Sequence, residues 1–563
     1  MRRTTTSSLA LCLCAPALFG ATPALADCAP SGAIIQCIGD DTDGYGDGSA
    51  ATDGTIVSVV GNTVVDNSTV AAGGDPVINL RDDAIVAINA GSSIESVLEG
   101  SNVLGLDDDG KVINTGTLAS HEKESRAIDG DKRIEVENAG TITTAKKDSD
   151  AINVNDDSKV TNLSGAVITT QGKDSDAVQI DSGSIVNNQA GALIQTLGDE
   201  SAAVKSDDGI DVFNWGTIKT EGEESEAIVV GQGSVINNMT GSLIETTGVK
   251  ADAIKSDFMI EVTNAGEIIT QDVNSDAIQA GDSSVILNQA TGFISAGKEG
   301  VNGDDNVRVT NYGTILGKDD AVKVGTNTVI KNYGVIENIG TNLADPQDAI
   351  DLDSGTVENF SGGIIRSTND AAIDFDEGAG TGEITNEGLI SGTTAVLVDG
   401  GNTGAQVINN FGSLVGTAGL FADLGEGDDA LNHYLGGSLT GGADFGAGMD
   451  RMSIFGEQTG DLAGGAVLDG GADFDVFTFV DYMFSDIVNV SFLGGVFDLS
   501  LDNGAGLFSL SVTNWEEFAF GKTLYSAAEV EALAAPAVPL PAGMVLMLTG
   551  LAGLGAARAR RRA

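Results

Sequence analysis

The side chains in this sequence that could carry out chemistry are mostly carboxylates. The chain of 563 residues has 82 Asp and Glu against 28 Lys and Arg, which gives a formal net charge of -54. Paired carboxylates are the usual groups for glycoside cleavage, and three adjacent pairs are present: Asp207-Asp208, Asp304-Asp305 and Asp319-Asp320. The acidic balance argues against a nucleic acid partner, because binding phosphates needs clustered cations.

Histidine chemistry has little support in the sequence. Only two histidines are present, His121 and His433, and they lie far apart without a ligand-spaced partner. Zinc centres and Ser-His-Asp triads both need such partners. The sequence therefore gives little support to histidine-based zinc chemistry or to a Ser-His-Asp triad.

A second set of acids recurs at a regular spacing, each followed by Ala and then by Ile or Val. A catalytic site needs one place where a repeat is broken to gather unlike groups, whereas these acids recur with the repeat itself. We therefore interpret them as architectural and expect no enzymatic activity, with a polysaccharide lyase or glycoside hydrolase as the alternative. The recurring acids are Asp150, Asp176, Glu226, Asp252, Asp276, Asp320 and Asp348.

Glycine and aspartate alternate in three turns near the C-terminal end. The turns begin at Gly425, Gly446 and Gly471. They resemble the RTX nonapeptide, whose glycine turns and Asp carboxylates bind calcium, although RTX motifs run in tandem and these are separated by 21 and 25 residues. The resemblance implies calcium as a cofactor, and the alternative is that Gly-Asp pairs simply form turns. The implied ligands are Asp429, Asp450, Asp473 and Asp475.

The elements that would position these acids are short strands in a repeated unit. A pattern V-x-N-x-G-x-I recurs between residues 89 and 414, with 21 to 27 residues between successive Asn residues. Ala-Ile and Ala-Val pairs recur between these Asn motifs. Apolar residues alternate at period two in the short runs of each repeat, which indicates strands. The repeated Asn residues are Asn89, Asn114, Asn138, Asn162, Asn188, Asn214, Asn238, Asn264, Asn288, Asn311, Asn332, Asn359, Asn386 and Asn410.

Such a unit buries its apolar face only by stacking on copies of itself. We therefore predict an all-β fold, a right-handed parallel β-helix of about 13 coils with a β-rich C-terminal cap; a β-propeller needs longer repeats. The Asn side chains should form a stacked amide ladder at a bend, and the Gly two residues later should supply a positive φ there. One internal ladder is expected from Ile142, Ile168, Ile194, Ile218, Ile244, Ile268, Ile294, Ile315 and Ile336, and a second from the Ala-Ile and Ala-Val pairs.

Stacking also places the recurring acids one coil apart, at about 4.8 Å. Like charges at that separation repel. The sequence therefore predicts that these carboxylates either extend into solvent or hold divalent cations between them.

The N-terminal residues predict export. Two arginines, an apolar run and Ala24-Leu25-Ala26 are typical of a secretory signal peptide that ends at residue 26. Its removal by signal peptidase leaves Cys28 and Cys37 as an even pair in an oxidising compartment. We therefore predict a disulfide between them.

The C-terminal residues combine a short motif, an apolar stretch and a basic cluster. The motif is Val538-Pro539-Leu540-Pro541-Ala542, and residues 542–557 are a marginal membrane span. The order resembles the PEP-CTERM sorting signal in its VPLPA variant, which implies a Gram-negative bacterium, transient anchoring in the inner membrane, processing by an exosortase, and display at the cell surface or in the extracellular matrix. The basic residues are Arg558, Arg560, Arg561 and Arg562.

The sequence thus divides into six expected parts. The expected function is a secreted structural or adhesive rod with extracellular polysaccharide as a candidate partner, and the Asn-Gly repeats are similar to those of autotransporter passengers. The parts are a signal peptide at 1–26, an acidic N-terminal segment at 27–50, β-helix repeats at 51–420, Gly/Asp turns continuing the solenoid at 421–480, a C-terminal β cap at 481–535 and a sorting signal at 536–563.

Overall fold

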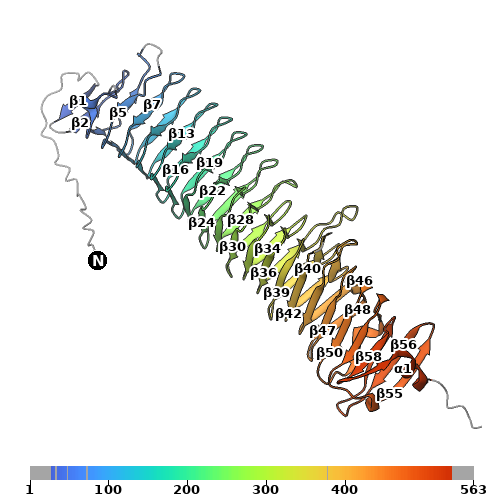
Figure 1. Ribbon diagram of the computed structural model, residues 1–563. Coiled ribbons are helices and arrows are strands. Elements are labelled where there is room, and N and C mark those ends of the chain that lie inside the picture. Colours follow the sequence, from blue (N-terminus) through green and yellow to red (C-terminus); the bar gives the residue numbers. More distant parts are fainter. Residues whose placement is uncertain are drawn as a thin grey trace, which may run out of the picture.

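The structure is a computed structural model that describes residues 27–534, except residues 32–33, 47, 71–73, 377 and 379. Strands make up 47% of the chain and helices 4%, so the protein is all-β. The strands wind into a parallel β-solenoid of about 18 turns, which forms a long rod with its first and last coils at opposite ends (Figure 1). The predicted fold class is confirmed. The expected signal peptide and sorting signal lie outside the described residues.

Each central coil contains three strands, and each strand pairs in parallel with its equivalents in the coils before and after it. In one such coil the strands are β12 (Glu135–Asn138), β13 (Thr141–Thr144) and β14 (Ile152–Val154). Alternate residues of β12 and β13 are buried, which is the period-two pattern of a strand with one face in a core.

The first strand of each central coil ends on the repeated Asn. These strands are β9 (Lys111–Asn114), β12, β15 (Lys159–Asn162), β18 (Ile185–Asn188), β21 (Asp211–Asn214), β24 (Val235–Asn238), β27 (Glu261–Asn264), β30 (Val285–Asn288), β33 (Arg308–Asn311), β36 (Thr328–Asn332), β39 (Gly355–Asn359), β42 (Gly382–Asn386) and β45 (Gln406–Asn410).

The second strand of each coil follows the Asn bend. These strands are β10 (Thr117–Ser120), β13, β16 (Val167–Thr170), β19 (Leu193–Thr196), β22 (Thr217–Thr220), β25 (Leu243–Thr246), β28 (Glu267–Thr270), β31 (Phe293–Ser295), β34 (Thr314–Gly317), β37 (Val335–Asn338), β40 (Ile364–Ser367), β43 (Leu389–Gly392) and β46 (Ser413–Asp423).

The third strand begins at the Ile or Val of the Ala-Ile and Ala-Val pairs, except for β32 (Val301–Gly303), in which Val301 follows Gly300. These strands are β11 (Ile128–Gly130), β14, β17 (Val178–Ile180), β20 (Val204–Lys205), β23 (Ile228–Val229), β26 (Ile254–Ser256), β29 (Ile278–Ala280), β32 (Val301–Gly303), β35 (Val322–Val324), β38 (Ile350–Leu352), β41 (Ile373–Phe375) and β44 (Val396–Val398).

Two apolar ladders fill the interior of the rod, as predicted. All nine isoleucines of the first ladder, from Ile142 to Ile336, are fully buried, and each is in register with the next. The Ala-Ile and Ala-Val pairs form the second ladder. One of its rungs, Val301, was not predicted, because Gly300 stands where Ala is expected.

The stacked amide ladder is also confirmed. From Asn114 to Asn410, each buried Asn donates a hydrogen bond through Nδ2 to Oδ1 of the next Asn, over 2.8–3.1 Å. Each side chain also bonds to backbone groups of the bend, as Asn138 does to the carbonyl of Val167. The Asn ladder therefore satisfies both halves of each amide in the interior.

The prediction of a positive φ at the glycine two residues after the Asn is wrong in the repeats that lack two extra residues in this turn. At Gly140 and Gly334 a Cβ would lie 2.1 Å from a glycine carbonyl oxygen of the preceding coil, so the requirement is close backbone approach. Positive φ occurs instead in the turns with two extra residues, as at Gly165 (φ 80°) and Gly241 (φ 81°). The extra residues let the chain turn through a left-handed glycine.

The predicted number of coils was too low because the Asn is not essential to a coil. Asn89 lies outside the ladder, and its neighbour Ile88 pairs with Asn114. Val59 precedes Ile88 at the same position, and His433 and Ile454 follow Asn410. The solenoid therefore extends beyond the Asn-containing repeats at both ends.

The N-terminal end of the rod is closed by an antiparallel hairpin. Its strands are β1 (Asp27–Ser31) and β2 (Ile34–Ile38), and β2 pairs in parallel with β3 (Ile56–Val59). Cys28 and Cys37 face each other in the hairpin and form a disulfide. The next strands are β4 (Val64–Asp66), β5 (Ile78–Leu80), β6 (Ile85–Ile88), β7 (Ser93–Ser96) and β8 (Leu104–Leu106).

The C-terminal end is closed by antiparallel strands and one helix. Strands β55 (Ile487–Leu493), β56 (Val496–Leu501) and β57 (Phe508–Thr513) form an antiparallel sheet, and β58 (Glu517–Phe520) pairs with β59 (Thr523–Ser526). Helix α1 (Ala527–Ala534) follows. Among the described residues, no helix has the length and apolar character needed to cross a bilayer.

The final coils before this cap keep the parallel pairing. Their strands are β47 (Ala430–His433), β48 (Ser438–Asp444), β49 (Ala447–Gly448), β50 (Arg451–Ile454), β51 (Gly460–Asp461), β52 (Val467–Asp469), β53 (Ala472–Asp473) and β54 (Val476–Phe479).

The Asn ladder can be tested at Asn238. Its Nδ2 donates to Asn264 and its Oδ1 accepts from Asn214 and Ser242. Replacing it in Asn238→Ala should lower the free energy of unfolding by about 1–3 kcal/mol, because it leaves buried amide groups unpaired. Denaturant unfolding measures this. Asn237→Ala, at the half-buried neighbouring position, is the control, and an equal loss in both variants would contradict a special role for the ladder.

Candidate functional site

Three predicted calcium ligands stack directly on one another in the last coils. Asp429, Asp450 and Asp475 immediately precede strands β47, β50 and β54, which pair in parallel in that order. One carboxylate oxygen of Asp450 accepts the N–H of Asp429 at 2.7 Å, and one oxygen of Asp475 accepts the N–H of Asp450 at 2.8 Å. Asp429 accepts the N–H of Gln406 in the same way. We call these three residues the aspartate stack.

The other oxygen of each carboxylate in the aspartate stack has no hydrogen-bond partner. Asp429, Asp450 and Asp475 are at most 1% exposed, and in each the Oδ2 atom is buried. Burial, opposed by the backbone hydrogen bonds, raises the pKa of Asp429 to about 8, of Asp450 to about 7 and of Asp475 to about 6. Three buried carboxylate oxygens on consecutive coils therefore lack a partner from the described residues.

The spacing of the glycine turns matches one coil of the solenoid. Turns at Gly425 and Gly446 lie in adjacent coils, and a Cβ on Gly446 would meet the carbonyl oxygen of Gly425 at 1.7 Å. Motifs 21 and 25 residues apart therefore come into direct contact without being in tandem. Asp473 differs from the other predicted ligands, because it is exposed and lies outside the stack.

The aspartate stack offers ligands suited to a hard divalent cation. Calcium takes six to eight oxygen ligands from carboxylates, backbone carbonyls and water. Buried carboxylate oxygens without partners meet this requirement, and a cation would stabilise their ionised form. Calcium at these residues stays a prediction.

For the recurring acids of the central coils, the predicted alternative of extension into solvent is wrong, while divalent cations between them stay a prediction. Asp150, Asp176, Asp252, Asp276 and Asp320 are buried, so they do not extend into solvent. Each accepts the N–H of the equivalent residue in the next coil, at 2.7–3.2 Å. The carboxylates therefore pair with backbone donors and contribute to coil stacking.

Basic side chains of the protein neutralise much of this acidic column. Lys205 lies 3.3 Å from Asp176, and Lys255 lies 3.1 Å from Glu226. Arg126 lies 3.2 Å from Asp150. This pairing was not predicted. The sequence did contain a signal for it, since Lys205 and Lys255 both stand three residues after a position of the acidic column.

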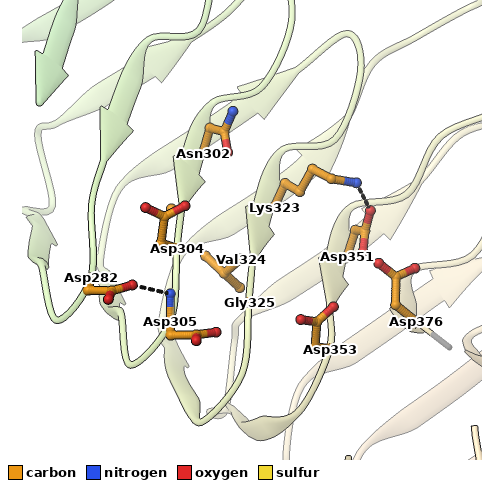
Figure 2. A pocket seen from close by; sticks show the side chains of 11 residues that line it. Asp282, Asn302, Asp304, Asp305, Lys323, Val324, Gly325, Asp351, Asp353 and Asp376 are labelled. Atoms are coloured by element: carbon orange, nitrogen blue, oxygen red, sulfur yellow. Dashed lines mark hydrogen bonds and ion pairs between the residues drawn. The ribbon is translucent and has the colours of Figure 1, made fainter. Parts of the chain in front are cut away.

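A separate acidic pocket of about 440 Å³ opens beside strands β32, β35 and β38 (Figure 2). Lys323 lies in this pocket and donates a hydrogen bond to Asp351. Burial raises the pKa of Asp304 and of Asp353 above the ordinary range. The lining carboxylates are Asp282, Asp304, Asp305, Asp351, Asp353 and Asp376.

The predicted carboxylate pairs are distributed along the rod and do not converge. Asp207 and Asp208 are exposed, Asp304 and Asp305 line the acidic pocket, and Asp320 belongs to the recurring column. His433 takes the place of an Asn in the ladder, 3.2 Å from Asn410, and burial lowers its pKa to about 4. Its role is therefore structural, while His121 is exposed beside Glu95.

The aspartate stack predicts a dependence of stability on pH and calcium. The folded-state pKa values of Asp429 and Asp450 lie above the ordinary value of 3.8. In the presence of a chelator, the contribution of these two groups to the free energy of unfolding should be fully present below pH 4 and should be lost as the pH rises to about 8. The reason is that the folded state keeps these protons to a higher pH than the unfolded state does. Millimolar calcium should remove this decline by stabilising the carboxylates.

Thermal unfolding followed by circular dichroism, in EDTA and in calcium across this pH range, measures the effect. Glu299 and Asp348 elsewhere have raised pKa values of about 8 and 9. The contribution of the aspartate stack is therefore the difference between the pH and calcium responses of the natural chain and those of the Asp450→Asn variant. Identical calcium and pH responses in these two proteins would contradict a calcium site here.

Comparisons with known proteins gave no match at any of three levels. No protein-family model matches the chain. No curated protein matches it, and no solved structure matches it.

Proposed function

We propose that this protein is a secreted, non-catalytic rod of the cell surface or extracellular matrix, with calcium bound by its C-terminal coils. The observation that carries this proposal is the use of the recurring acids in coil-to-coil contacts. Asp252, for example, accepts a backbone N–H of the next coil at 2.8 Å, and its neighbour Lys255 pairs with Glu226. Carboxylates bound in this way serve the stacking of the rod.

The rod presents exposed aromatic rings that suit an adhesive role. Tyr312, Tyr333 and Phe360 stack on successive coils with ring centroids 4.6 and 4.1 Å apart. Further along, the same position in the repeat carries a second stack that begins at Phe411 and continues through Tyr434. Tyr312 is 46% exposed and Phe411 is 42% exposed. Exposed aromatic surface of this kind is enriched where proteins bind partners, and extracellular polysaccharide is the partner we propose.

Export and display rest on the two terminal sequences. The signal peptide would direct the chain across the inner membrane, and the VPLPA motif would be processed by an exosortase-type enzyme. The disulfide between Cys28 and Cys37 supports this proposal, because disulfides persist in oxidising compartments.

Export is tested by expressing the full chain in a Gram-negative host that carries an exosortase. Mass spectrometry of the exported protein should find an N-terminus at Asp27 and loss of the tail after the VPLPA motif. The control replaces Arg558, Arg560, Arg561 and Arg562 with alanine, which should reduce tail processing and leave signal cleavage intact. An intact residue 1 on protein that stays in the cytoplasm would overturn the export proposal.

One observation favours the alternative function of polysaccharide cleavage. The acidic pocket holds Asp304 and Asp353, whose pKa values are raised by burial, beside the salt bridge between Lys323 and Asp351. Glycoside hydrolysis needs two carboxyl groups that flank the scissile bond, and this pocket brings several carboxyls together. Lyases and hydrolases of polysaccharides also use the parallel β-helix fold, so this alternative is tested directly.

The two functions differ in what they do to a polymer. We expect no new reducing ends and no unsaturated products when the purified protein is incubated with a panel of acidic and neutral polysaccharides. Retention of the protein on one of these polymers, measured by sedimentation, would support adhesion. Product formation that is lost in Asp353→Asn, but not in Asp207→Asn at an exposed site, would replace the rod proposal with an enzyme.

A further inference from the structure

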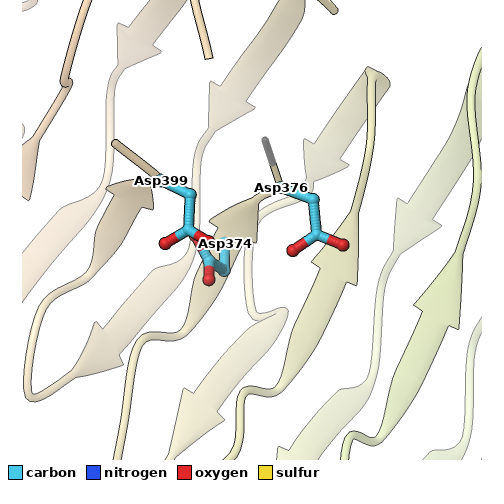
Figure 3. A group of neighbouring side chains, drawn as sticks. All are labelled: Asp374, Asp376 and Asp399. Atoms are coloured by element: carbon cyan, nitrogen blue, oxygen red, sulfur yellow. The ribbon is translucent and has the colours of Figure 1, made fainter. Parts of the chain in front are cut away.

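A cluster of three carboxylates, of which Asp376 also lines the acidic pocket, lies outside the aspartate stack. Asp374 is the middle residue of β41, Asp376 follows β41, and Asp399 follows β44 in the next coil. Asp374 and Asp376 are two residues apart on an extended segment, so they share one face of the sheet. The N–H of Asp399 donates to the carbonyl of Phe375, which brings Asp399 beside Asp376. Figure 3 shows the three side chains grouped together.

The three residues offer oxygen atoms close enough to share one ion. A carboxylate oxygen from each of Asp374, Asp376 and Asp399 lies within 4.8 Å of the other two. Oxygens that bind the same calcium ion at 2.3–2.6 Å lie at most about 5.2 Å apart. The observed spacing is within this limit.

A second observation points to a ligand at this cluster. Asp374 is only 8% exposed, and its Oδ1 atom is buried without a hydrogen-bond partner. Burial, and then the charges of Asp399 and Asp351, raise the pKa of Asp374 to about 8. The repeat does not require an acid here, because the equivalent position carries Asn302 and then Lys323 in earlier coils.

The cluster has no ion pair of its own among the described residues, although the charge of Lys323 acts on Asp376. In the described part of the chain, none of Asp374, Asp376 and Asp399 forms an ion pair with Lys, Arg or His. Lys323 is the nearest basic residue in the neighbouring pocket, and it pairs with Asp351 and Asp320. Between Lys331 and Lys522 the sequence contains only two basic residues, Arg366 and Arg451.

We propose that Asp374, Asp376 and Asp399 bind one calcium ion. Asp374 supplies the buried oxygen that otherwise lacks a partner. Asp376 and Asp399 are half-buried, so water can complete the six to eight ligands that calcium takes. The site is separate from the aspartate stack, and it would bind calcium whether or not the stack does.

Calcium binding to the full chain, measured by isothermal titration with calcium chloride, tests the proposal. The double variant Asp376→Asn with Asp399→Asn should bind one calcium ion fewer per chain than the natural protein. The matched control, Asp304→Asn with Asp353→Asn, removes two charges from the neighbouring pocket and should keep the full stoichiometry. Unchanged stoichiometry in the first variant, or an equal loss in the control, would overturn the proposal.

Two further measurements distinguish this site from the aspartate stack and from a variant that fails to fold. Asp450→Asn in the aspartate stack should leave this calcium ion in place, so failure of the two sites can be told apart. Crystals of the natural chain grown in calcium chloride should show anomalous scattering between the three carboxylates, which does not depend on the folding of any variant. A map with no peak at that position would refute the site.

Discussion

Stacking of identical positions is the constraint on which the rest of this structure depends. In a parallel solenoid a residue that recurs once per coil lies directly against its own copy, about 4.8 Å away. Isoleucine tolerates this contact because apolar side chains attract one another in the interior. The Asn ladder tolerates it because an amide has both a donor and an acceptor, so each side chain satisfies the next. A carboxylate only accepts hydrogen bonds, and a column of carboxylates therefore needs donors or cations from elsewhere.

The chain meets this need in different ways along its length. In the central coils the carboxylates of Asp176 and Asp252 accept backbone N–H groups, and Lys205 and Lys255 supply the positive charge. Basic residues become rare after Lys331. Buried carboxylate oxygens without partners then appear in that part of the rod, at Asp348, Asp374, Asp429, Asp450 and Asp475. The distribution of lysine along the sequence thus explains where the rod would need ions from solution.

The sequence predicts the fold well because the fold is a consequence of the repeat. Period-two alternation defined the strands, and the spacing of the Asn residues placed Ile142 and Ile168 in register. The ends of the solenoid were harder to predict, since Ile88 and His433 fill the Asn position with other side chains. The recurrence of glycine at the bend was attributed to a positive φ, whereas the structure shows that glycine is needed for close approach to the backbone of the preceding coil. Contact between coils has no signature within one repeat.

The site was predictable only in part, for a related reason. The Gly-Asp pattern identified Asp429, Asp450 and Asp475, whose contacts follow from the coil length. Asp374, Asp376 and Asp399 belong to no motif, and only the register of two coils brings them together.

The uneven distribution of charge also bears on the proposed function. Coils neutralised by their own lysines can stack at low calcium, whereas the coils from Asp348 onward bury acids with raised pKa values and no basic partner. Protons can fill that role up to the raised pKa values of these carboxyls, and a divalent cation can replace the protons as counter-ion for adjacent carboxylates. Such a chain would complete its C-terminal coils where calcium is plentiful. This fits the export and the calcium binding proposed above.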